Sequence, residues 1–369
     1  MKNILLCGFF GQNNLGDDLL LLEALSKIPK EFNIYIKTSK LKNDILKEYV
    51  KYRDFKLVTN YKDLYRRQYE YLIYGGGGQF PSIEYGFKDY LRFLLLRLRC
   101  KKVVVNGCGI VPKPKSLFFK LFIKQLYYCS VRDDISANFI RRIRKDVVNC
   151  GDLYWGNEKH YTNEHNLNKK CVVCLANPFS EKEKLIPHFR ERYNLFLKNI
   201  CEVIYTIKNK GFIIEYLPFY EEYDNKLISD IQNIINSNDK ILQRNIDYNI
   251  KDIDKIISQY QLGFCMRFHS ILLAVKNNLP IVAINYDYKS ESLLHEAGLE
   301  KFGTRFGVRN NQFFGKEIDL DMKSLYKSLI YATTEVDEYR IKASKFYNIK
   351  HNDVLRNYSR IFNSNNINN

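Results

Sequence analysis

Residues 261–298 read QLGFCMRFHSILLAVKNNLPIVAINYDYKSESLLHEAG, and this stretch decides the fold. QLGFC has the apolar character of a short strand, FHSILLAVKNN has the apolar face of a helix, and PIVAIN is a second buried strand followed by another helix. A strand–helix–strand unit builds parallel sheet and places its functional loops at the carboxyl ends of the strands. The stretch therefore predicts an α/β protein.

Two basic side chains, Arg267 and His269, lie where the first strand of this unit passes into its helix. Backbone N–H groups and the helix dipole favour an anion at such a place. A guanidinium and an imidazole two positions apart suit a carboxylate or phosphate ligand. The alternative is structural: Arg267 pairs with an acidic neighbour, and His269 caps the helix.

The length of 369 residues is long for a single core, so two domains are expected. The segment 157–170, NEKHYTNEHNLNKK, is polar and without periodicity, as in an interdomain linker. We expect one domain over residues 1–160 and a second over 170–335. Residues 336–369 are expected to form a C-terminal helix with a disordered tail.

The net charge is +17, from 58 Lys and Arg against 41 Asp and Glu. No nucleic-acid-binding signature is present and the basic residues are spread along the chain, so no nucleic acid is expected as a partner. Helices predicted over 88–102 and 116–129 carry Arg or Lys among apolar residues and could rest on a membrane surface. Helices that pack on a sheet and turn a basic face to solvent explain the same pattern.

Nine cysteines at irregular spacing, mostly within apolar runs, indicate reduced thiols in a cytosolic protein. Cys171 and Cys174 have metal-ligand spacing, but CVVCLAN reads as a core strand and no second pair follows, so no metal is expected. No apolar run reaches the ~20 residues that span a bilayer. The first residues read as a buried strand rather than a signal peptide. We expect a cytoplasmic protein, with peripheral contact at the inner face of the cell membrane as a hypothesis.

The loop GFFGQNNLGDD (8–18) lies between the first predicted strand and a helix, as in a generic phosphate or nucleotide cradle. Its spacing is not GxGxxG and it contains no GK[ST], so neither nicotinamide nor P-loop chemistry is supported. Asp17 and Asp18 at the helix start are equally good as caps.

Further glycine loops follow later strands of the first domain. Four glycines, Gly75 to Gly78, precede Gln79; they have no packing use, and a loop that lines a ligand is favoured over a tight turn. KVVVN ends in the loop Gly107–Gly109. Arg132, in CSVRDD, occupies the same kind of strand-to-helix junction as Arg267.

The order of these motifs resembles the polysaccharide pyruvyl transferase family, from about residue 3 to about residue 300. The resemblance rests on six segments: GFFGQNNLGDD (8–18), YGGGGQF (74–80), GCGIVP (107–112), VRDDIS (131–136), CMRFHS (265–270) and NYDYK (285–289). Asp18 stands where glutamate is common, and Val111 stands where the last glycine of its motif is usual.

This resemblance implies an α/β fold of two Rossmann-like domains facing across a cleft, similar to the GT-B arrangement. It implies transfer of pyruvate from phosphoenolpyruvate onto two hydroxyls of a sugar, with formation of a cyclic ketal and release of phosphate. The acceptor would be a saccharide of a bacterial surface polysaccharide, such as a capsule or exopolysaccharide, or its lipid-linked precursor. No cofactor is implied beyond phosphoenolpyruvate as donor substrate.

The resemblance also assigns roles to residues of this sequence. Arg132, Arg267, His269 and Lys289 would bind the donor, because a carboxylate and a phosphate on one small frame require a cluster of cations. Arg267 and His269 would be catalytic, and His269 would deliver a proton to C3 of the donor as general acid. Asp17 would deprotonate or orient the acceptor, with an N-cap as an equal alternative. The acceptor-side or loop contacts would come from Gly11, Asn14, Gly16, Gly76, Gly77 and Gly109.

Two other functions remain open at this point. A GT-B-type glycosyltransferase with a nucleotide-sugar donor could use the same architecture and a basic cleft. A non-catalytic glycan-binding subunit is the third reading, against which the Arg-x-His pair argues, because an inactive site has no need of it. The sequence makes no prediction about oligomeric state.

Overall fold

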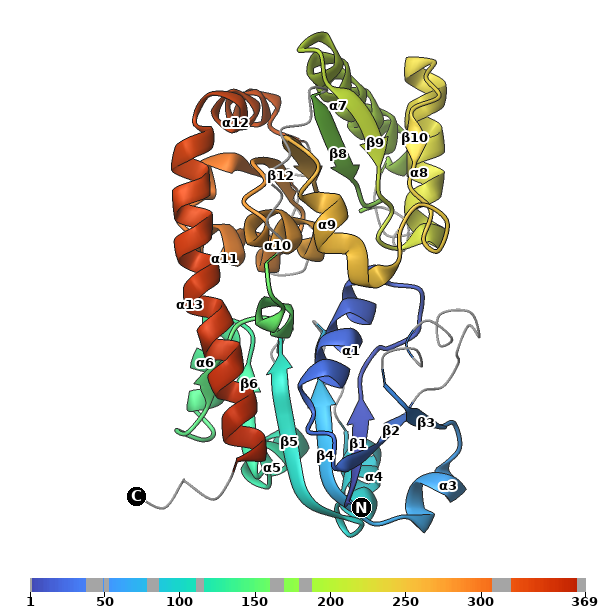
Figure 1. Ribbon diagram of the computed structural model, residues 1–369, viewed down its shortest axis with the longest axis vertical. Helices are drawn as coiled ribbons and strands as arrows, with labels where there is room; N and C mark the ends of the chain where they lie inside the picture. Colours follow the sequence, from blue (N-terminus) through green and yellow to red (C-terminus); the bar gives the residue numbers. More distant parts are fainter. Residues whose placement is uncertain are drawn as a thin grey trace. The chain divides into compact units, whose positions relative to one another are not determined.

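The computed structural model describes residues 2–37, 49, 53–77, 86–110, 116–159, 169–178, 188–306 and 320–363 (Figure 1). The chain divides into two compact units. Unit 1 comprises Met1–Asn157 with Ile349–Asn369, and unit 2 comprises Glu158–Asn348. Each unit is built on one sheet in which neighbouring strands run parallel.

The sheet of unit 1 has the strand order β3-β2-β1-β4-β5-β6-β7. Its strands are β1 (Lys2–Cys7), β2 (Phe32–Lys37), β3 (Phe55–Val58), β4 (Tyr69–Gly75), β5 (Cys100–Cys108), β6 (Tyr128–Val131) and β7 (Val148–Asn149). This is the Rossmann order with one added strand, and the direction of winding reverses between β1 and β4. Ligands of such sheets bind beyond the carboxyl ends of the strands at that reversal.

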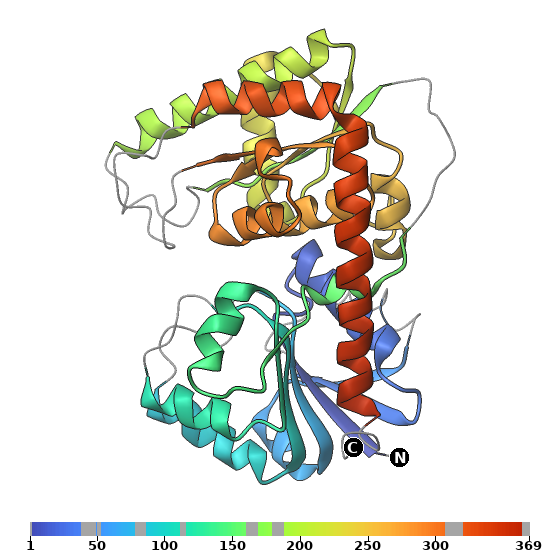
Figure 2. The same ribbon diagram turned by 90° about the vertical axis from the view of Figure 1, so that its left-hand side faces the viewer.

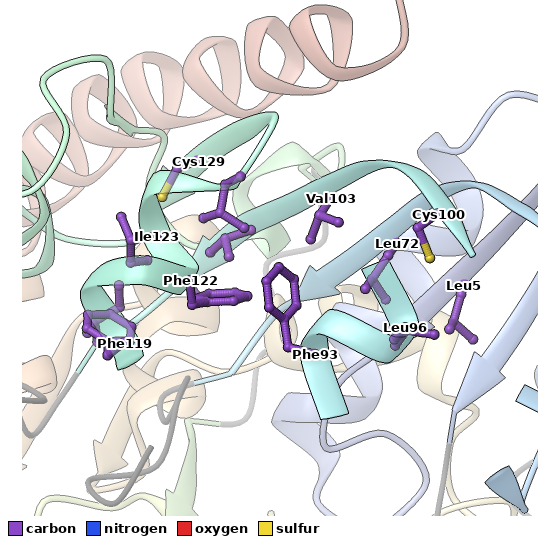
Figure 3. Packing of buried hydrophobic residues seen from close by; sticks show 14 of the residues in the cluster. Leu5, Leu72, Phe93, Leu96, Cys100, Val103, Phe119, Phe122, Ile123 and Cys129 are labelled. Carbon is purple, nitrogen blue, oxygen red and sulfur yellow. The ribbon is translucent and has the colours of Figure 1, made fainter. Parts of the chain in front are cut away.

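Helices cover both faces of this sheet. They are α1 (Leu15–Lys27), α3 (Tyr61–Arg66), α4 (Phe87–Arg97), α5 (Leu117–Lys124), α6 (Asp134–Arg141) and the 3-10 turn η1 (Leu153–Gly156), joined by part of α13 (Val336–Phe362). Figure 2 shows α4 and α5 on one face of the sheet and α13 on the other. Phe93 of α4 packs edge-on against Phe122 of α5, with ring centroids 4.7 Å apart, inside the core drawn in Figure 3.

The sheet of unit 2 has the order β10-β9-β8-β11-β12-β13, which again is the Rossmann order. Its strands are β8 (Lys170–Cys174), β9 (Ile213–Tyr216), β10 (Lys240–Ile241), β11 (Leu262–Cys265), β12 (Ile281–Asn285) and β13 (Gly303–Arg305). Its helices are α7 (Phe189–Asn209), α8 (Glu221–Ile235), α9 (Ile253–Ile257), α10 (Phe268–Lys276), α11 (Tyr288–Glu296) and α12 (Met322–Thr334), with 3-10 turns η2 (Ile250–Asp252) and η3 (Glu300–Phe302). The strand–helix–strand unit predicted from residues 261–298 is confirmed as β11, α10, β12 and α11.

Some predicted boundaries are wrong. The helices predicted over 88–102 and 116–129 end early, at Arg97 and Lys124, because the residues that follow enter β5 and β6. Residues 303–305 form the edge strand β13 and pair with β12. Most of the predicted linker (160–168) and the predicted tail (364–369) lie outside the described residues.

Cys171 and Cys174 lie buried in β8, so the prediction of a core strand there is confirmed. Burial also raises the pKa of several thiols, among them Cys100, Cys129 and Cys150, each to about 12. The folded protein therefore keeps these protons at a pH where the unfolded chain, with an ordinary thiol pKa of ~8.5, releases them.

The helix α13 belongs to both units, since the division between them falls at Asn348 and Ile349. The C-terminal helix expected from residue 336 is present, but it is divided between the two units instead of forming a separate segment. Buried Asn357 holds the end of α13 to the sheet of unit 1: its Nδ2 donates to Asn106 Oδ1 at 2.6 Å, and the Tyr128 hydroxyl donates to its Oδ1 at 2.9 Å.

We predict that Asn357→Ala lowers the free energy of unfolding by about 1–3 kcal/mol, because Asn106 and Tyr128 lose a buried partner. Urea denaturation measures the change. Arg356→Ala removes an exposed side chain from the same helix and should cost under about 0.5 kcal/mol. Equal losses for the two variants would contradict the role of the Asn357 contacts.

We also predict that stability falls as pH rises through the alkaline range. A raised thiol pKa in the folded state stabilises fully below the unfolded pKa of ~8.5 and is lost as pH approaches about 12. Each such thiol contributes a slope of up to about 1.4 kcal/mol per pH unit. Urea midpoints under reducing conditions near pH ~8 and pH ~10 should show the decline, and it should be shallower in Cys129→Ala. An unchanged slope in that variant would show that Cys129 does not contribute.

Candidate functional site

The loop after β1 is fixed by its own polar side chains. Asn14 is the N-cap of α1, and its Oδ1 accepts from the Gly16 N–H at 3.1 Å. Asp18 is fully buried, and its Oδ1 accepts from the Gly11 N–H at 3.1 Å. The alternative that Asp17 or Asp18 caps the helix is therefore wrong. Asn14 takes the cap, and Asp18 instead ties the loop to the first turn of α1.

The structure brings four predicted site residues together at the carboxyl edge of the unit 1 sheet. Gly77 has a positive φ of 83°, and a Cβ there would lie 3.0 Å from Asp17 Oδ1. Its carbonyl accepts from the Gly109 N–H at 3.1 Å. A Cβ on Gly109 would lie only 2.4 Å from Arg132 Nη2. Asp17, Gly77, Gly109 and Arg132 thus form one contiguous chain of contacts.

Gly76 is held tightly by packing, contrary to the prediction that these glycines have no packing use. Its φ is +70°, and a Cβ would lie 2.9 Å from side-chain atoms of Leu20 in α1. Glycine is required here because both the backbone conformation and the space exclude a side chain. Gly78, Gln79 and Val111, which the sequence also singled out, lie outside the described residues.

Arg132 follows β6 and is buried between two carboxylates. Its Nε lies 3.8 Å from Asp133 Oδ2, and its Nη1 lies 3.8 Å from Asp152 Oδ2. Asp133 is also the N-cap of α6. Arg132 occupies a strand-to-helix junction as predicted, but β6 stands two strands beyond β4 and so away from the reversal of winding.

Arg267 lies at the reversal of winding in unit 2, directly beyond β11, and is the N-cap residue of α10. Its Nε donates to Asp224 Oδ2 at 3.4 Å, and its Nη2 donates to Asp224 Oδ1. Asp224 is fully buried, and its Oδ2 also accepts from the N–H groups of Phe219 (3.0 Å) and Tyr220 (2.9 Å). The structural alternative for Arg267, an acidic partner, is thus present, while 22% of its side chain stays exposed.

Tyr286, which follows β12, is a second neighbour of Arg267. Burial raises the pKa of Tyr286 to about 12, although the positive charge of Arg267 acts to lower it. Burial alone would lower the pKa of Arg267, but Tyr286 and Asp224 raise it above the ordinary value. The guanidinium is therefore a permanent cation beside a protonated phenol at neutral pH.

His269 and Lys289 are the second residues of α10 and α11. Both are partly buried, and the His269 ring lies edge-on to Phe268 with centroids 5.1 Å apart. Because Arg267 occupies the N-cap position, the alternative that His269 caps α10 is wrong. The two helices follow the adjacent strands β11 and β12, so Arg267, His269 and Lys289 lie along one edge of the unit 2 sheet.

Unit 1 contains a hollow of about 410 Å³ beside the first glycine loop. Its lining includes residues at or just beyond the ends of three neighbouring strands: Cys7 to Phe9 and Gln12 after β1, Lys37 of β2, and Val58 to Tyr61 after β3. Phe9 is 54% exposed, whereas the adjacent Phe10 is buried. The Lys37 ammonium lies 5.7 Å from the centroid of the Tyr61 ring. Among the described residues, the lining of the hollow therefore combines exposed aromatic surface, amide groups and the Lys37 ammonium.

Sequence reasoning missed Asp224, Tyr286 and this hollow. Asp224 is one of several acidic residues at the start of a helix, and nothing local marks it as the partner of an arginine 43 positions later. Tyr286 lies inside the NYDYK motif, in which a role was predicted for Lys289 alone. The hollow is assembled from three separate segments, so no single motif signals it.

The defining sequence pattern of the polysaccharide pyruvyl transferase family matches residues 14–288. These residues include the Asn14–Asp18 cap and the Arg267–His269 junction described above. The chain belongs to the polysaccharide pyruvyl transferase family. Family membership makes it a transferase concerned in general terms with polysaccharide pyruvylation. No curated protein matches this chain in sequence.

Solved structures show the same fold at low sequence identity. The MnaA–UDP complex of S. aureus is 12% identical over 98% of this chain and 96% of that chain, with a TM-score of 0.62. A glycosyltransferase of Rickettsia africae ESF-5 is 11% identical over 100% and 99%, with a TM-score of 0.57. UDP-GlcNAc 2-epimerase of Neisseria meningitidis is 10% identical over 99% of each chain, with a TM-score of 0.56. The predicted fold class, α/β with two Rossmann-like domains of the GT-B kind, is confirmed.

The expectation that the protein binds no metal stays a prediction. Among the described residues no group of three or more His, Cys, Asp or Glu side chains is placed to hold a metal ion.

We predict that Gly109→Ala displaces the Arg132 guanidinium, because its methyl group would overlap Nη2 at 2.4 Å. The free energy of unfolding should fall by about 1–3 kcal/mol, as for other overpacked sites. Gly75→Ala is the matched control, since the nearest atom to its Cβ is Ile73 Cγ2 at 3.8 Å, an ordinary contact. Urea unfolding of both variants measures the difference, and equal stability would show that the Arg132 side chain moves aside at no cost.

Proposed function

We propose that this transferase moves pyruvate from phosphoenolpyruvate onto two hydroxyls of a saccharide, with release of phosphate. The observation that carries the proposal is the position of the family's Arg-x-His segment. Arg267 and His269 begin the helix that follows β11, at the reversal of winding where Rossmann-like sheets bind ligands. Lys289, from the next strand–helix junction, adds a second cation to the same edge.

The donor's charges match this edge of unit 2. Phosphoenolpyruvate carries a carboxylate and a phosphate on three carbons, and fixed cations with helix N-terminal N–H groups bind both kinds of group. Arg267 is held in place by Asp224, so it would meet the donor without a cost for ordering its side chain. We assign the donor contacts of unit 2 to Arg267, His269 and Lys289; Arg132, the remaining predicted donor contact, belongs to unit 1.

The proposed reaction has two steps at C2 of the donor. In the first, a sugar hydroxyl oxygen bonds to C2, His269 gives a proton to C3, and the hydroxyl proton passes to a base, for which Asp17 is our candidate. In the second, the oxygen of another sugar hydroxyl bonds to C2 while the C2–O bond to phosphate breaks, and the proton of that hydroxyl passes to the imidazole of His269, which gave up its own proton in the first step. The phosphate departs with the bonding electrons, and the cationic groups stabilise its charge.

We place the saccharide acceptor in the hollow of unit 1. An exposed aromatic ring such as Phe9 offers a surface for the apolar face of a sugar, and Gln12 adds an amide group to the same lining. A volume of about 410 Å³ is within the usual range for small-molecule sites. The predicted loop contacts Gly11, Asn14 and Gly16 belong to the same β1–α1 segment.

The test is a thermal-unfolding titration with phosphoenolpyruvate on the wild type, His269→Gln, Lys289→Gln and Arg267→Lys. Arg267→Lys is preferred to Arg267→Ala, because alanine would leave the buried Asp224 carboxylate without this cation. We expect the donor to raise the wild-type midpoint. Each variant should bind about tenfold more weakly, which removes about 1.4 kcal/mol of ligand stabilisation at saturating donor.

His295→Gln is the matched control, because His295 is exposed on α11 and paired with Glu300. It should respond to donor like the wild type. The second candidate function, glycosyl transfer from a nucleotide sugar, is favoured by neighbours of this fold whose structures contain UDP or UDP-GlcNAc. Stabilisation by uridine diphosphate with no effect of phosphoenolpyruvate would replace pyruvyl transfer with that function.

A further inference from the structure

The helices α4 and α5 fill the core of unit 1 with their inner faces. Phe93 of α4 and Phe122 of α5 meet inside the cluster drawn in Figure 3. Phe87 and Phe118 contact each other at the other end of the pair, with ring centroids 5.5 Å apart and ring planes tilted by 56°. The two helices therefore lie side by side on one face of the sheet, as Figure 2 shows, and their remaining apolar residues are not needed to fill this core.

The outer face of the pair is nevertheless apolar. We call the α4–α5 surface the set Phe87, Leu91, Leu95 and Leu98 with Leu117 and Leu121. These side chains are between 37% and 78% exposed. On α4 the spacings of four, four and three residues place all four on one stripe, and Leu117 and Leu121 are one turn apart on α5.

Basic side chains accompany this stripe. Lys88 and Arg92 are exposed and, at 100° per residue, lie along one side of the α4 stripe, and Arg99 is exposed in the turn just after α4. Lys120 and Lys124 are exposed on α5. In α4 and α5, both of which the structure describes in full, the one acidic residue is Asp89. The surface is therefore apolar and strongly positive at once.

We propose that the α4–α5 surface docks on an anionic lipid bilayer. An interfacial helix buries apolar side chains at the boundary between headgroups and acyl chains, while lysine and arginine reach lipid phosphates. The single sign of the charge favours a sheet of anionic headgroups over a protein surface of mixed charge. Contact is peripheral, because none of the described helices combines the length and apolar character needed to cross a bilayer.

One consequence rests on the proposed function. An enzyme held at a membrane by unit 1 meets acceptors that are themselves anchored there, so docking favours a lipid-linked saccharide over a free polymer as acceptor. Docking itself needs neither donor nor acceptor. A protein that does not bind vesicles would therefore contradict docking but not the proposed function, and a protein that does not bind donor would contradict the proposed function but not docking.

The experiment is sedimentation of the full chain with vesicles of phosphatidylglycerol and phosphatidylethanolamine, compared with vesicles of phosphatidylcholine alone. We expect binding to the anionic vesicles at low salt and its loss near 1 M salt, where the Debye length is about 3 Å. Leu91→Gln/Leu95→Gln/Leu98→Gln should weaken binding at least about tenfold. Lys88→Gln/Arg92→Gln/Arg99→Gln should weaken it and flatten its dependence on salt.

The matched control replaces three exposed isoleucines of α12 and α13, as Ile330→Gln/Ile341→Gln/Ile349→Gln. It should bind vesicles like the wild type, and all variants should keep the thermal midpoint of the folded protein. The proposal is overturned if the wild type stays in the supernatant with anionic vesicles at low salt, or if the control loses as much binding as the leucine variant. Sedimentation velocity without vesicles tests whether a second copy of the chain binds the α4–α5 surface instead. If the wild type is a dimer, the leucine variant is a monomer and the wild type does not bind vesicles, this surface is a self-association interface.

Discussion

The ion pair between Arg267 and the buried Asp224 carboxylate is the contact on which the candidate site at the carboxyl edge of the unit 2 sheet depends. Asp224 accepts from the backbone at the start of α8 and from the guanidinium at the start of α10, so one carboxylate fixes two helix ends. The far end of α10 is fixed in the same way, because the fully buried Lys276 ammonium lies 2.8 Å from Asp254 Oδ2. A buried charge is tolerated only with its partner, so α10 has little freedom to shift.

The same arrangement explains why a paired arginine still suits a ligand site. A carboxylate that holds Arg267 at rest removes the cost of ordering a long side chain when an anion binds. Arg132 in unit 1 also lies beside carboxylates, but with a different geometry. Its Nε and Nη1 lie 3.8 Å from carboxylate oxygens of Asp133 and Asp152, farther than Arg267 lies from Asp224. Glycines complete the second site, because Gly109 leaves the space that the Arg132 guanidinium occupies.

Sequence reasoning succeeded where structure is local. Periodicity was enough to predict β11, α10, β12 and α11, and the family motifs named Asp17, Gly77, Gly109 and Arg132, although they did not predict that these four residues lie next to one another. It failed where contacts between segments far apart in the sequence determine the structure. The helix predicted through residue 102 continues the pattern of its leucines, but pairing with β4 draws residues from Cys100 onward into a strand. The partner of Arg267 and the three-segment hollow of unit 1 likewise depend on contacts that no local pattern encodes.

The shared helix α13 has a consequence for the order in which the protein can be made. Residues from Ile349 onward belong to unit 1, and Asn357 supplies a buried partner for Asn106 and Tyr128, which are encoded some 230 to 250 positions earlier. On the ribosome the first sheet is therefore synthesised long before the helix that completes it. Unit 2, whose residues run uninterrupted from Glu158 to Asn348, can close first. Unit 1 can therefore complete its buried contacts only after all of unit 2 has been synthesised.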